Sequence, residues 1–392
     1  MLEALPPPAP DRLMILMGMF RDDPRPEKID LGIGVYRDAE GRTPVFRTVR
    51  EAERRIAESE TTRAYLGFTG DPAVVATMAE RVLGPDRAAR ATGSQSTGGT
   101  GALFALGRLA ALARVGARVW LPEPTWINHA SLLTAAGLTC ETYPWLDAAG
   151  RELDFEAAVA ALEQVPAGDL VVLHACCHNP SGADPDAAGW ARLAAIAAER
   201  RWIPFFDVAY PGLGRGWDED LAGLRTMVDA APETLIAVSG SKSFGLYRDR
   251  AGVALVVSPT AEARRAAGEA LAVVNRNSVS FPPWRPGEVM RRIFADDALA
   301  EDWAAELAEM RARISGNRRA LSEALARRPG GGGWSFLEEQ RGMFSLLGLD
   351  EDQVTRLRET HAIYVMPRGR INVAGLAASE TERFAEALLS VA

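Results

Sequence analysis

The chain has 392 residues, of which 47% are apolar, and carries a formal net charge of -8 with an isoelectric point near 5.3. This length exceeds the size at which a single core usually divides, so we expect two domains. The acidic balance argues against nucleic acid or an anionic membrane as the partner, although local arginine clusters can still bind small anions. No basic leader followed by an apolar segment opens the chain, which predicts a cytoplasmic protein.

In the middle of the chain, short apolar runs alternate with alanine-rich helical stretches, a pattern typical of a mostly parallel sheet covered by helices. The expected strands are 118–121, 170–175, 203–207, 235–238 and 253–257, with helices between them, for example at 155–163 and 187–200.

A second region begins near Asp296 with a long amphipathic helix and continues past a glycine breaker at 330–333. Short strands near 342–347 and 363–366 and a final helix follow. We therefore predict a large domain over 41–295, and a small α+β domain built from both chain ends, 1–40 and 296–392.

The basic residues are unevenly divided, because only Lys28 and Lys242 are lysines among 44 lysines and arginines. A lysine amine can deprotonate and attack a carbonyl to form a Schiff base, whereas an arginine stays protonated. Lys242 lies in a small-residue loop directly after an expected strand. It is therefore either a nucleophile or a solvated loop residue, whereas Lys28 has the surroundings of an ordinary surface residue.

Other polar residues follow the expected strands, where ligands bind in open parallel sheets. Gly99 and Thr100 open a helix, and backbone amides with a hydroxyl suit a phosphate, although such turns are often only turns. Asp207 ends an apolar strand, which predicts a partly desolvated carboxylate or a helix cap. Arg250 follows Lys242 by eight residues and could return to the same phosphate.

These parts together suit pyridoxal 5'-phosphate, which needs a lysine for its aldehyde, a phosphate cradle and a carboxylate for its pyridine nitrogen. Trp126 and Tyr210 add an aromatic face and a phenol that could lie against the cofactor ring.

The cysteines raise the question of a metal, because Cys176 and Cys177 lie between His174 and His178. Adjacent residues on a strand point to opposite faces, so this segment cannot present all four side chains to one ion. We therefore expect no metal site here.

Six segments resemble the class I aspartate and aromatic amino acid aminotransferases of the pyridoxal phosphate fold type I. The segments are DLGIGVYRD at 30–38, PTWINH at 124–129, HACCHNPSG at 174–182, FDVAY at 206–210, SKSFGLY at 241–247 and GRINVAG at 369–375. The resemblance implies an α/β fold with a mostly parallel seven-stranded sheet flanked by helices, plus a smaller α+β domain.

The resemblance also implies how the cofactor is held. Lys242 would be the covalent anchor and proton shuttle, and Asp207 would pair with the pyridine nitrogen. The remaining contacts would come from Asn179 and Tyr210 to the 3'-oxygen, Trp126 to the ring, and Gly99, Thr100, Ser239, Arg250 and the partner subunit's Tyr65 to the phosphate.

For the substrate, the resemblance implies that Arg370 grips the α-carboxylate with help from Asn179, Trp126 and the backbone of Gly34. Arg276, reaching in from the second copy of a homodimer, would meet a distal carboxylate. The active sites would then be shared between the two subunits.

The chain departs from the family pattern where side-chain specificity is set. The family's Tyr-Ser-Asn-Pro-Pro after Arg276 is replaced by a run with Val279 and Phe281, which leaves fewer polar groups to hold that arginine and favours an aromatic substrate. Pro211 replaces a glutamine and Arg368 replaces a serine, which affects the pocket rather than the cofactor chemistry.

The resemblance predicts a pyridoxal phosphate-dependent aminotransferase that moves the amino group of aspartate, of aromatic amino acids or of both to 2-oxoglutarate in two half-reactions. Two alternatives stay open: a lyase or decarboxylase on the same fold, and a non-catalytic pyridoxal phosphate-binding domain.

Overall fold

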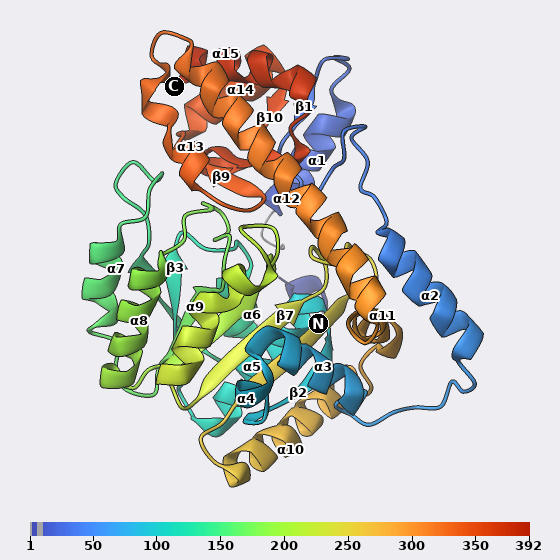
Figure 1. Cartoon of the computed structure of the whole chain (residues 1–392). Coiled ribbons are helices and arrows are strands. Elements are labelled where there is room, and N and C mark those ends of the chain that lie inside the picture. The colour runs from blue at the N-terminus through green and yellow to red at the C-terminus, as the bar shows by residue number, and fades with distance from the viewer. Residues whose placement is uncertain (1, 6–10) are drawn as a thin grey trace.

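The computed structural model describes residues 2–5 and 11–392, and its centre is a seven-stranded sheet (Figure 1). The strand order is β2-β8-β7-β6-β5-β3-β4. The strands are β2 (Ala91–Thr97), β3 (Arg118–Glu123), β4 (Thr139–Pro144), β5 (Leu170–His174), β6 (Ile203–Val208), β7 (Thr234–Ser239) and β8 (Ala251–Val257). Strand β8 is antiparallel to both of its neighbours, and the other paired strands are parallel. The predicted mostly parallel sheet of seven strands is therefore confirmed.

Some of the helices cover both faces of this sheet, and others pack outside it. The helices are α1 (Arg12–Asp22), α2 (Arg47–Ser59), α3 (Pro72–Leu83), α4 (Pro85–Ala88), α5 (Gly98–Ala113), α6 (His129–Ala135), α7 (Phe155–Leu162), α8 (Ala187–Arg200), α9 (Trp217–Ala230), α10 (Ala261–Ser278), α11 (Trp284–Phe294), α12 (Asp297–Ala326), α13 (Phe336–Glu339), α14 (Glu351–His361) and α15 (Thr381–Val391). One apolar cluster packs α7, α8 and α9 against the sheet, and another packs α5, α6 and α10 against its opposite face.

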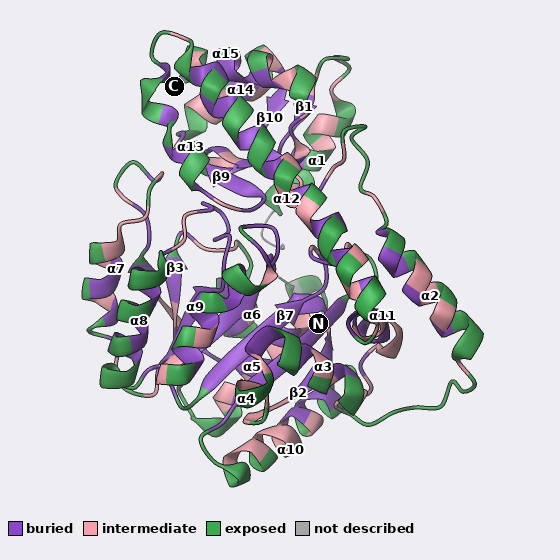
Figure 2. Cartoon of the chain, in the orientation of Figure 1, coloured by how far each residue is buried: buried purple, intermediate pink, exposed green. Residues whose placement is uncertain are grey.

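Strand β6 shows why the sheet is buried on both sides. Phe205 belongs to one cluster and Phe206 to the other, because successive side chains of a strand point to opposite faces. A strand covered on both faces is apolar throughout rather than alternating. Figure 2 shows inner strands of the central sheet, such as β7, buried beneath the helices.

A separate apolar cluster gathers residues from both ends of the chain. Ile29 and Leu31 pack with side chains from α12, α14 and α15. Two small sheets accompany it: β1 (Ile29–Asp30) is parallel to β10 (Ile363–Tyr364), and β9 (Phe344–Leu346) is antiparallel to β11 (Arg370–Asn372). The domain bounds proposed from the sequence stay a prediction.

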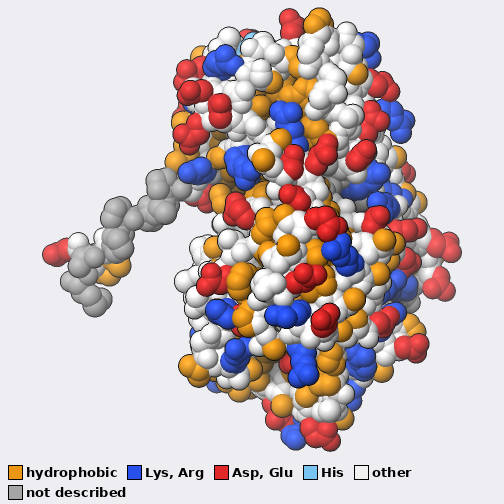
Figure 3. All heavy atoms as spheres, turned by 90° about the vertical axis from the view of Figure 1, so that its left-hand side faces the viewer, with side chains coloured by type: hydrophobic (Ala, Val, Ile, Leu, Met, Phe, Trp, Pro, Cys, Tyr) orange, Lys and Arg blue, Asp and Glu red, His pale blue; other side chains and the backbone are white. Residues whose placement is uncertain are grey.

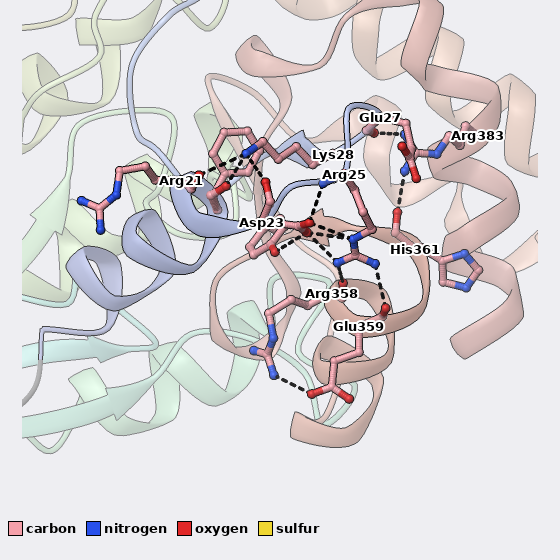
Figure 4. A network of polar contacts seen from close by, with 11 residues as sticks. Arg21, Asp23, Arg25, Glu27, Lys28, Arg358, Glu359, His361 and Arg383 are labelled. Atoms are coloured by element: carbon pink, nitrogen blue, oxygen red, sulfur yellow. Dashed lines mark hydrogen bonds and ion pairs between the residues drawn. The ribbon is translucent and has the colours of Figure 1, made fainter.

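The N-terminal segment is attached to this region by the polar network of Figure 4. The Arg25 guanidinium donates to the backbone oxygens of Arg358 and Glu359, both at 2.8 Å, and pairs with Asp23 at 2.6 Å. Lys28 donates to the backbone oxygens of Phe20 and Asp23 at 2.7 and 2.6 Å. Lys28 is partly exposed and contacts backbone oxygens at the C-terminal end of α1, which its local sequence did not indicate.

Charged side chains of both signs are interspersed on the face of the molecule shown in Figure 3, and no continuous basic area covers that face. Within residues 2–5 and 11–392, no helix is both long and apolar enough to cross a bilayer.

Candidate active site

One cavity lies at the carboxyl ends of the parallel strands, as expected for an open α/β sheet. It brings together nine of the residues singled out in the sequence with three further ones. Its lining residues are Gly99, Thr100, Leu103, Trp126, Asn179, Asp207, Ala209, Tyr210, Ser239, Ser241, Lys242 and Arg250.

Lys242 follows β7 after two short residues, which lets the loop turn into the cavity. Its ammonium nitrogen lies 5.0 Å from the centre of the Tyr210 ring. Burial lowers the pKa of Lys242, nearby Asp207 raises it and the Arg250 guanidinium lowers it again, and the net effect is a decrease. A lower pKa increases the fraction of neutral amine, which is the nucleophilic form.

Asp207 is the next-to-last residue of β6 and a buried carboxylate whose partner is a histidine. Its Oδ2 lies 3.3 Å from Nε2 of His129 and 4.0 Å from Nε2 of His174. Burial alone would raise the pKa of Asp207, but the hydrogen bond with His129 and the charge of Lys242 help to bring it below its usual value. Asp207 therefore stays ionised at neutral pH and can hold a cationic ring nitrogen.

The start of α5 forms the anion-binding side of the cavity. No side chain caps this helix, so its first amides are available to a ligand. A Cβ on Gly99 would lie 2.9 Å from Cβ of Ser239, and one on Gly98, where φ is +72°, would lie 2.6 Å from the Arg250 guanidinium. The two glycines therefore let the helix start approach Ser239 and Arg250 closely enough to share one phosphate.

Asn179 and Tyr210 also line the cavity and contact each other, because the Asn179 amide donates to the Tyr210 hydroxyl at 3.3 Å. Burial, with a smaller contribution from Asp207, raises the pKa of Tyr210, so its phenol keeps its proton. The lysine, the carboxylate, the phenol and the phosphate cradle are the donor set that pyridoxal 5'-phosphate requires, and they fit it.

Arg370 begins β11, and its guanidinium lies 4.6 Å from the centre of the Phe344 ring and donates to the backbone oxygen of Gly32 at 2.5 Å. Its buried Nε has no hydrogen-bond partner among the described residues. Phe344 connects this arginine to the cavity, because its ring meets that of Tyr210 edge to face at 5.9 Å and lies 3.1 Å from the place of a Cβ on Gly34. An unpaired guanidinium nitrogen at this place suits a carboxylate.

Tyr65 and Arg276 do not line the cavity. Both are exposed and lie together elsewhere: the Tyr65 ring stacks on Phe281 at 4.5 Å, and the Arg276 guanidinium lies 5.0 Å from the centre of the Phe68 ring. Arg276 also donates to the Ser280 hydroxyl at 2.8 Å. Phe281, which replaces a polar family residue, thus packs against Tyr65 and Phe68.

The other departures from the family pattern also have visible contacts. The backbone oxygen of Pro211 accepts a hydrogen bond from Ser243, beside Lys242, at 2.7 Å. Arg368 has a φ of +58° and a half-exposed guanidinium 3.8 Å from the Glu123 carboxylate, at the rim of the large sheet.

Residues 174–178 do not form the continuous strand that the expected absence of a metal site assumes. Strand β5 ends at His174, and Cys177 has a φ of +53°. Among the residues that the structure describes, two groups of three buried side chains have possible ligand atoms within 4.8 Å of one another. They are His129, His174 and Asp207, and Cys176, Cys177 and Asp220.

Sequence reasoning missed His129, His174 and Phe344 as parts of the site. His129 and His174 lie in segments that carry the family resemblance, but their proximity to Asp207 depends on how α6, β5 and β6 pack together. Phe344 had no local signal beyond its place in an expected strand.

The fold and this cavity define a pyridoxal 5'-phosphate enzyme. The family model for class I and II aminotransferases matches residues 26–388, and the chain belongs to that family. A tyrosine aminotransferase of Rhizobium meliloti is 46% identical over 98% of both chains, and an aspartate aminotransferase of Escherichia coli is 40% identical over 97% of both. The aromatic amino acid aminotransferase of Burkholderia pseudomallei, covalently bound to pyridoxal phosphate, has a TM-score of 0.96 at 36% identity over 100% of this chain and 99% of that one. The predicted enzyme class and cofactor are confirmed.

Proposed function

We propose that this enzyme transfers the amino group of aspartate and of aromatic amino acids to 2-oxoglutarate in two half-reactions. The observation that carries the proposal is the cavity in which Lys242 and Asp207 face the phosphate cradle, with the unpaired Nε of Arg370 beside it. When bound, pyridoxal 5'-phosphate supplies an aldehyde for the substrate amine and a ring that withdraws electrons from the α-carbon.

Residues at and beyond the carboxyl ends of the strands of the large sheet would hold the cofactor. Asp207 pairs with the pyridine nitrogen, while Asn179 and Tyr210 contact the 3'-oxygen and Trp126 lies on the ring. The phosphate is held by the amides of Gly99 and Thr100 together with Ser239 and Arg250. These assignments are supported by the shared cavity and by the charges described above.

Lys242 would move the proton that leaves the substrate α-carbon, because burial lowers the pKa of its amine and so increases the fraction in the neutral form that can accept a proton. Arg370 would fix the substrate through its α-carboxylate with two parallel hydrogen bonds, and Gly34, Asn179 and Trp126 would close around that carboxylate. Every amino acid and keto acid carries this group, so Arg370 would serve all substrates alike.

The protein would work as a homodimer in which Tyr65 reaches the partner's phosphate site and Arg276 reaches a distal substrate carboxylate. Their exposure in one patch, away from the cavity of their own chain, supports this arrangement. The amide of Asn275, next to Arg276, donates to the backbone oxygen of Phe68 at 2.8 Å and holds the two segments of the patch together. A cytoplasmic location stays a prediction.

Arg276 provides the test of substrate class, because only dicarboxylic substrates have a second carboxylate to meet it. Arg276→Ala should lower kcat/KM for aspartate and glutamate by roughly 10-fold or more and leave phenylalanine within a few-fold, as expected for the loss of one charged partner. Equal losses for both classes would make Arg276 a structural residue and would contradict dual specificity.

A further inference from the structure

Arg318, on α12, is a buried arginine that the proposed reaction does not use. It is 3% exposed, and no carboxylate among the described residues lies within 4.0 Å of its guanidinium. Burial lowers the pKa of Arg318 to about 9, with nearby Arg341 lowering it further and Cys177 and Asp184 opposing the decrease. A buried charge without an ionic partner is costly and needs several hydrogen bonds.

Those hydrogen bonds converge on the segment that leads into β9. The guanidinium donates to the backbone oxygens of Phe344 and Gly342, at 2.5 and 2.8 Å, and to the Ser345 hydroxyl at 2.5 Å. Longer contacts reach the backbone oxygens of Leu337 and Arg341, both at 3.4 Å. The planar guanidinium thus holds residues 341–345 through several donors at once. A lysine ammonium, which is a compact point charge, could not make this set of hydrogen bonds.

The same segment presses on the turn that follows Asn179. The amide of Arg341 donates to the backbone oxygen of Gly182 at 2.7 Å. Gly182 has a φ of +73°, and a Cβ there would lie 2.7 Å from the backbone oxygen of Phe344 and 3.2 Å from the Arg318 guanidinium. Arg318 therefore lies where the β9 segment meets the loop that carries Asn179.

Phe344 transmits this placement to the carboxylate site. Its ring lies under Arg370, against Tyr210 and next to Gly34, and its backbone pairs with Asn372 in the ladder that joins β9 to β11. A shift of the β9 segment would therefore displace Arg370. A misplacement of about 1 Å at a substrate-positioning group can lower the reaction rate by about 100-fold.

We infer that Arg318 is a positioning residue that holds β9 and Phe344 so that Arg370 can bind the α-carboxylate of every substrate. The inference rests on the proposed function. It differs from the role of Arg276, because the α-carboxylate is common to dicarboxylic and aromatic substrates.

The test compares Arg318→Met with Arg319→Met, a control at the next position of the same helix, where the side chain is exposed. The probe is 3-phenylpropionate, a carboxylate without an amine, and its Kd is measured on the enzyme loaded with cofactor. Arg318→Met should raise that Kd by about 10-fold to 100-fold, and the control should leave it unchanged. The Kd of the cofactor is measured separately on cofactor-free protein. It should stay within a few-fold of wild type, because Arg318 does not contact the phosphate cradle.

Arg318→Lys is the second variant, because it keeps the charge if Arg318→Met fails to fold. A lysine is a point donor, so it should recover part of the affinity at most. Complete recovery with lysine, or a parallel loss of cofactor and carboxylate binding in either variant, would overturn the inference. If the wild-type enzyme transaminates and binds the probe, and both variants bind the probe equally well, the inference about Arg318 is overturned while the proposed function stands. If the wild-type enzyme shows no transaminase activity, the proposed function itself is overturned.

Discussion

Asp207 stays ionised inside the protein because its neighbours offset the effect of burial on its pKa. His129 lies against it, with the Nδ1 of that histidine 2.7 Å from the Thr125 hydroxyl, and His174 stacks on His129 at a ring distance of 5.3 Å. Both ring nitrogens of His174 lack partners among the described residues. Burial, together with the charge of His129, lowers the pKa of His174 to about 3, against the opposing charge of Asp207.

This lowered pKa predicts a pH-dependent stability. The unfolded chain has a histidine pKa near 6.5, so below that pH the unfolded state binds a proton that folded His174 does not bind. The stability contribution is complete above about pH 6.5 and falls by about 1.4 kcal/mol per pH unit as the pH drops towards 3.

His174→Phe should therefore reduce the loss of unfolding free energy between pH 7.5 and 5.5 by about 1.4 kcal/mol. Urea unfolding of wild type and variant at both pH values, at one protein concentration, measures this difference in unfolding free energy. Because the quantity is a difference between two variants, other titrating groups such as Asp184 cancel. Identical pH slopes for wild type and variant would contradict a neutral buried His174.

At the scale of elements, the site is built where strands end and one helix begins. The N-terminus of α5 faces the cavity without a side-chain cap, and two glycines permit the close approach to β7 and Arg250. Gly99→Ala should weaken cofactor binding by about 10-fold or more, because the added methyl would lie 2.9 Å from Ser239 and force the cradle open.

Gly316→Ala is the matched control for this change, since a Cβ at Gly316 in α12 has no neighbour within 4 Å. It should leave the cofactor Kd unchanged and stabilise the helix by up to about 1 kcal/mol. Equilibrium titration of cofactor-free protein measures both affinities, and an unchanged Kd for Gly99→Ala would show that the cradle is elsewhere.

The elements that the sequence predicts best are those covered on both faces. Strands β5, β6, β7 and β8 are continuous apolar runs, and each was expected close to its observed bounds. Strands β2 and β4 were missed because they are the two edges of the sheet and contain polar residues such as Ser94 and Glu141. Their pairing depends on neighbours distant in sequence, which local periodicity does not contain.

The residues of the site likewise divide into those with a local sequence signal and those whose role depends on contacts between distant segments. Lys242 and Asp207 could be predicted because each follows an apolar strand and has side-chain chemistry that the cofactor needs. Residue type and position also indicated the phosphate cradle and the aromatic face of the cofactor site. The roles of Asn179 and Ser239 and those of the substrate-binding residues came from the family resemblance. Arg318 could not be found among so many arginines, because its importance comes from the carbonyl groups that surround it after folding.

In the whole molecule, the two ends of the chain pack together and complete the carboxylate side of the site. Helix α12 extends from beside α11 to this region (Figure 1). Arg370 and Gly34 come from opposite ends of the chain and meet at Phe344. Tyr65 and Arg276, in contrast, are exposed on the surface away from the cavity of their own chain. This exposure is the basis for proposing active sites shared between two subunits.

A mixed dimer of one Lys242→Ala chain and one Arg276→Ala chain tests the sharing of sites. In the proposed arrangement, one of its two sites combines an intact Lys242 with an intact Arg276 from the other chain. The purified mixed dimer should therefore recover about half of the wild-type rate with aspartate. A rate no higher than half that of the Arg276→Ala homodimer would place both residues in the site of one chain.

Lys242 is proposed to provide both the nucleophilic amine and the proton transfer for amino transfer, and a single half-reaction measures both roles. Loaded enzyme mixed with aspartate or phenylalanine, without any keto acid, should form about one keto acid per active site and then stop, with no release of carbon dioxide or free ammonia. Lys242→Ala and Lys242→Arg should form none on that timescale, because neither side chain supplies a nucleophilic amine that can also carry the proton. Continued turnover without an acceptor, release of carbon dioxide or ammonia, or an undiminished burst in the Lys242 variants would contradict the account.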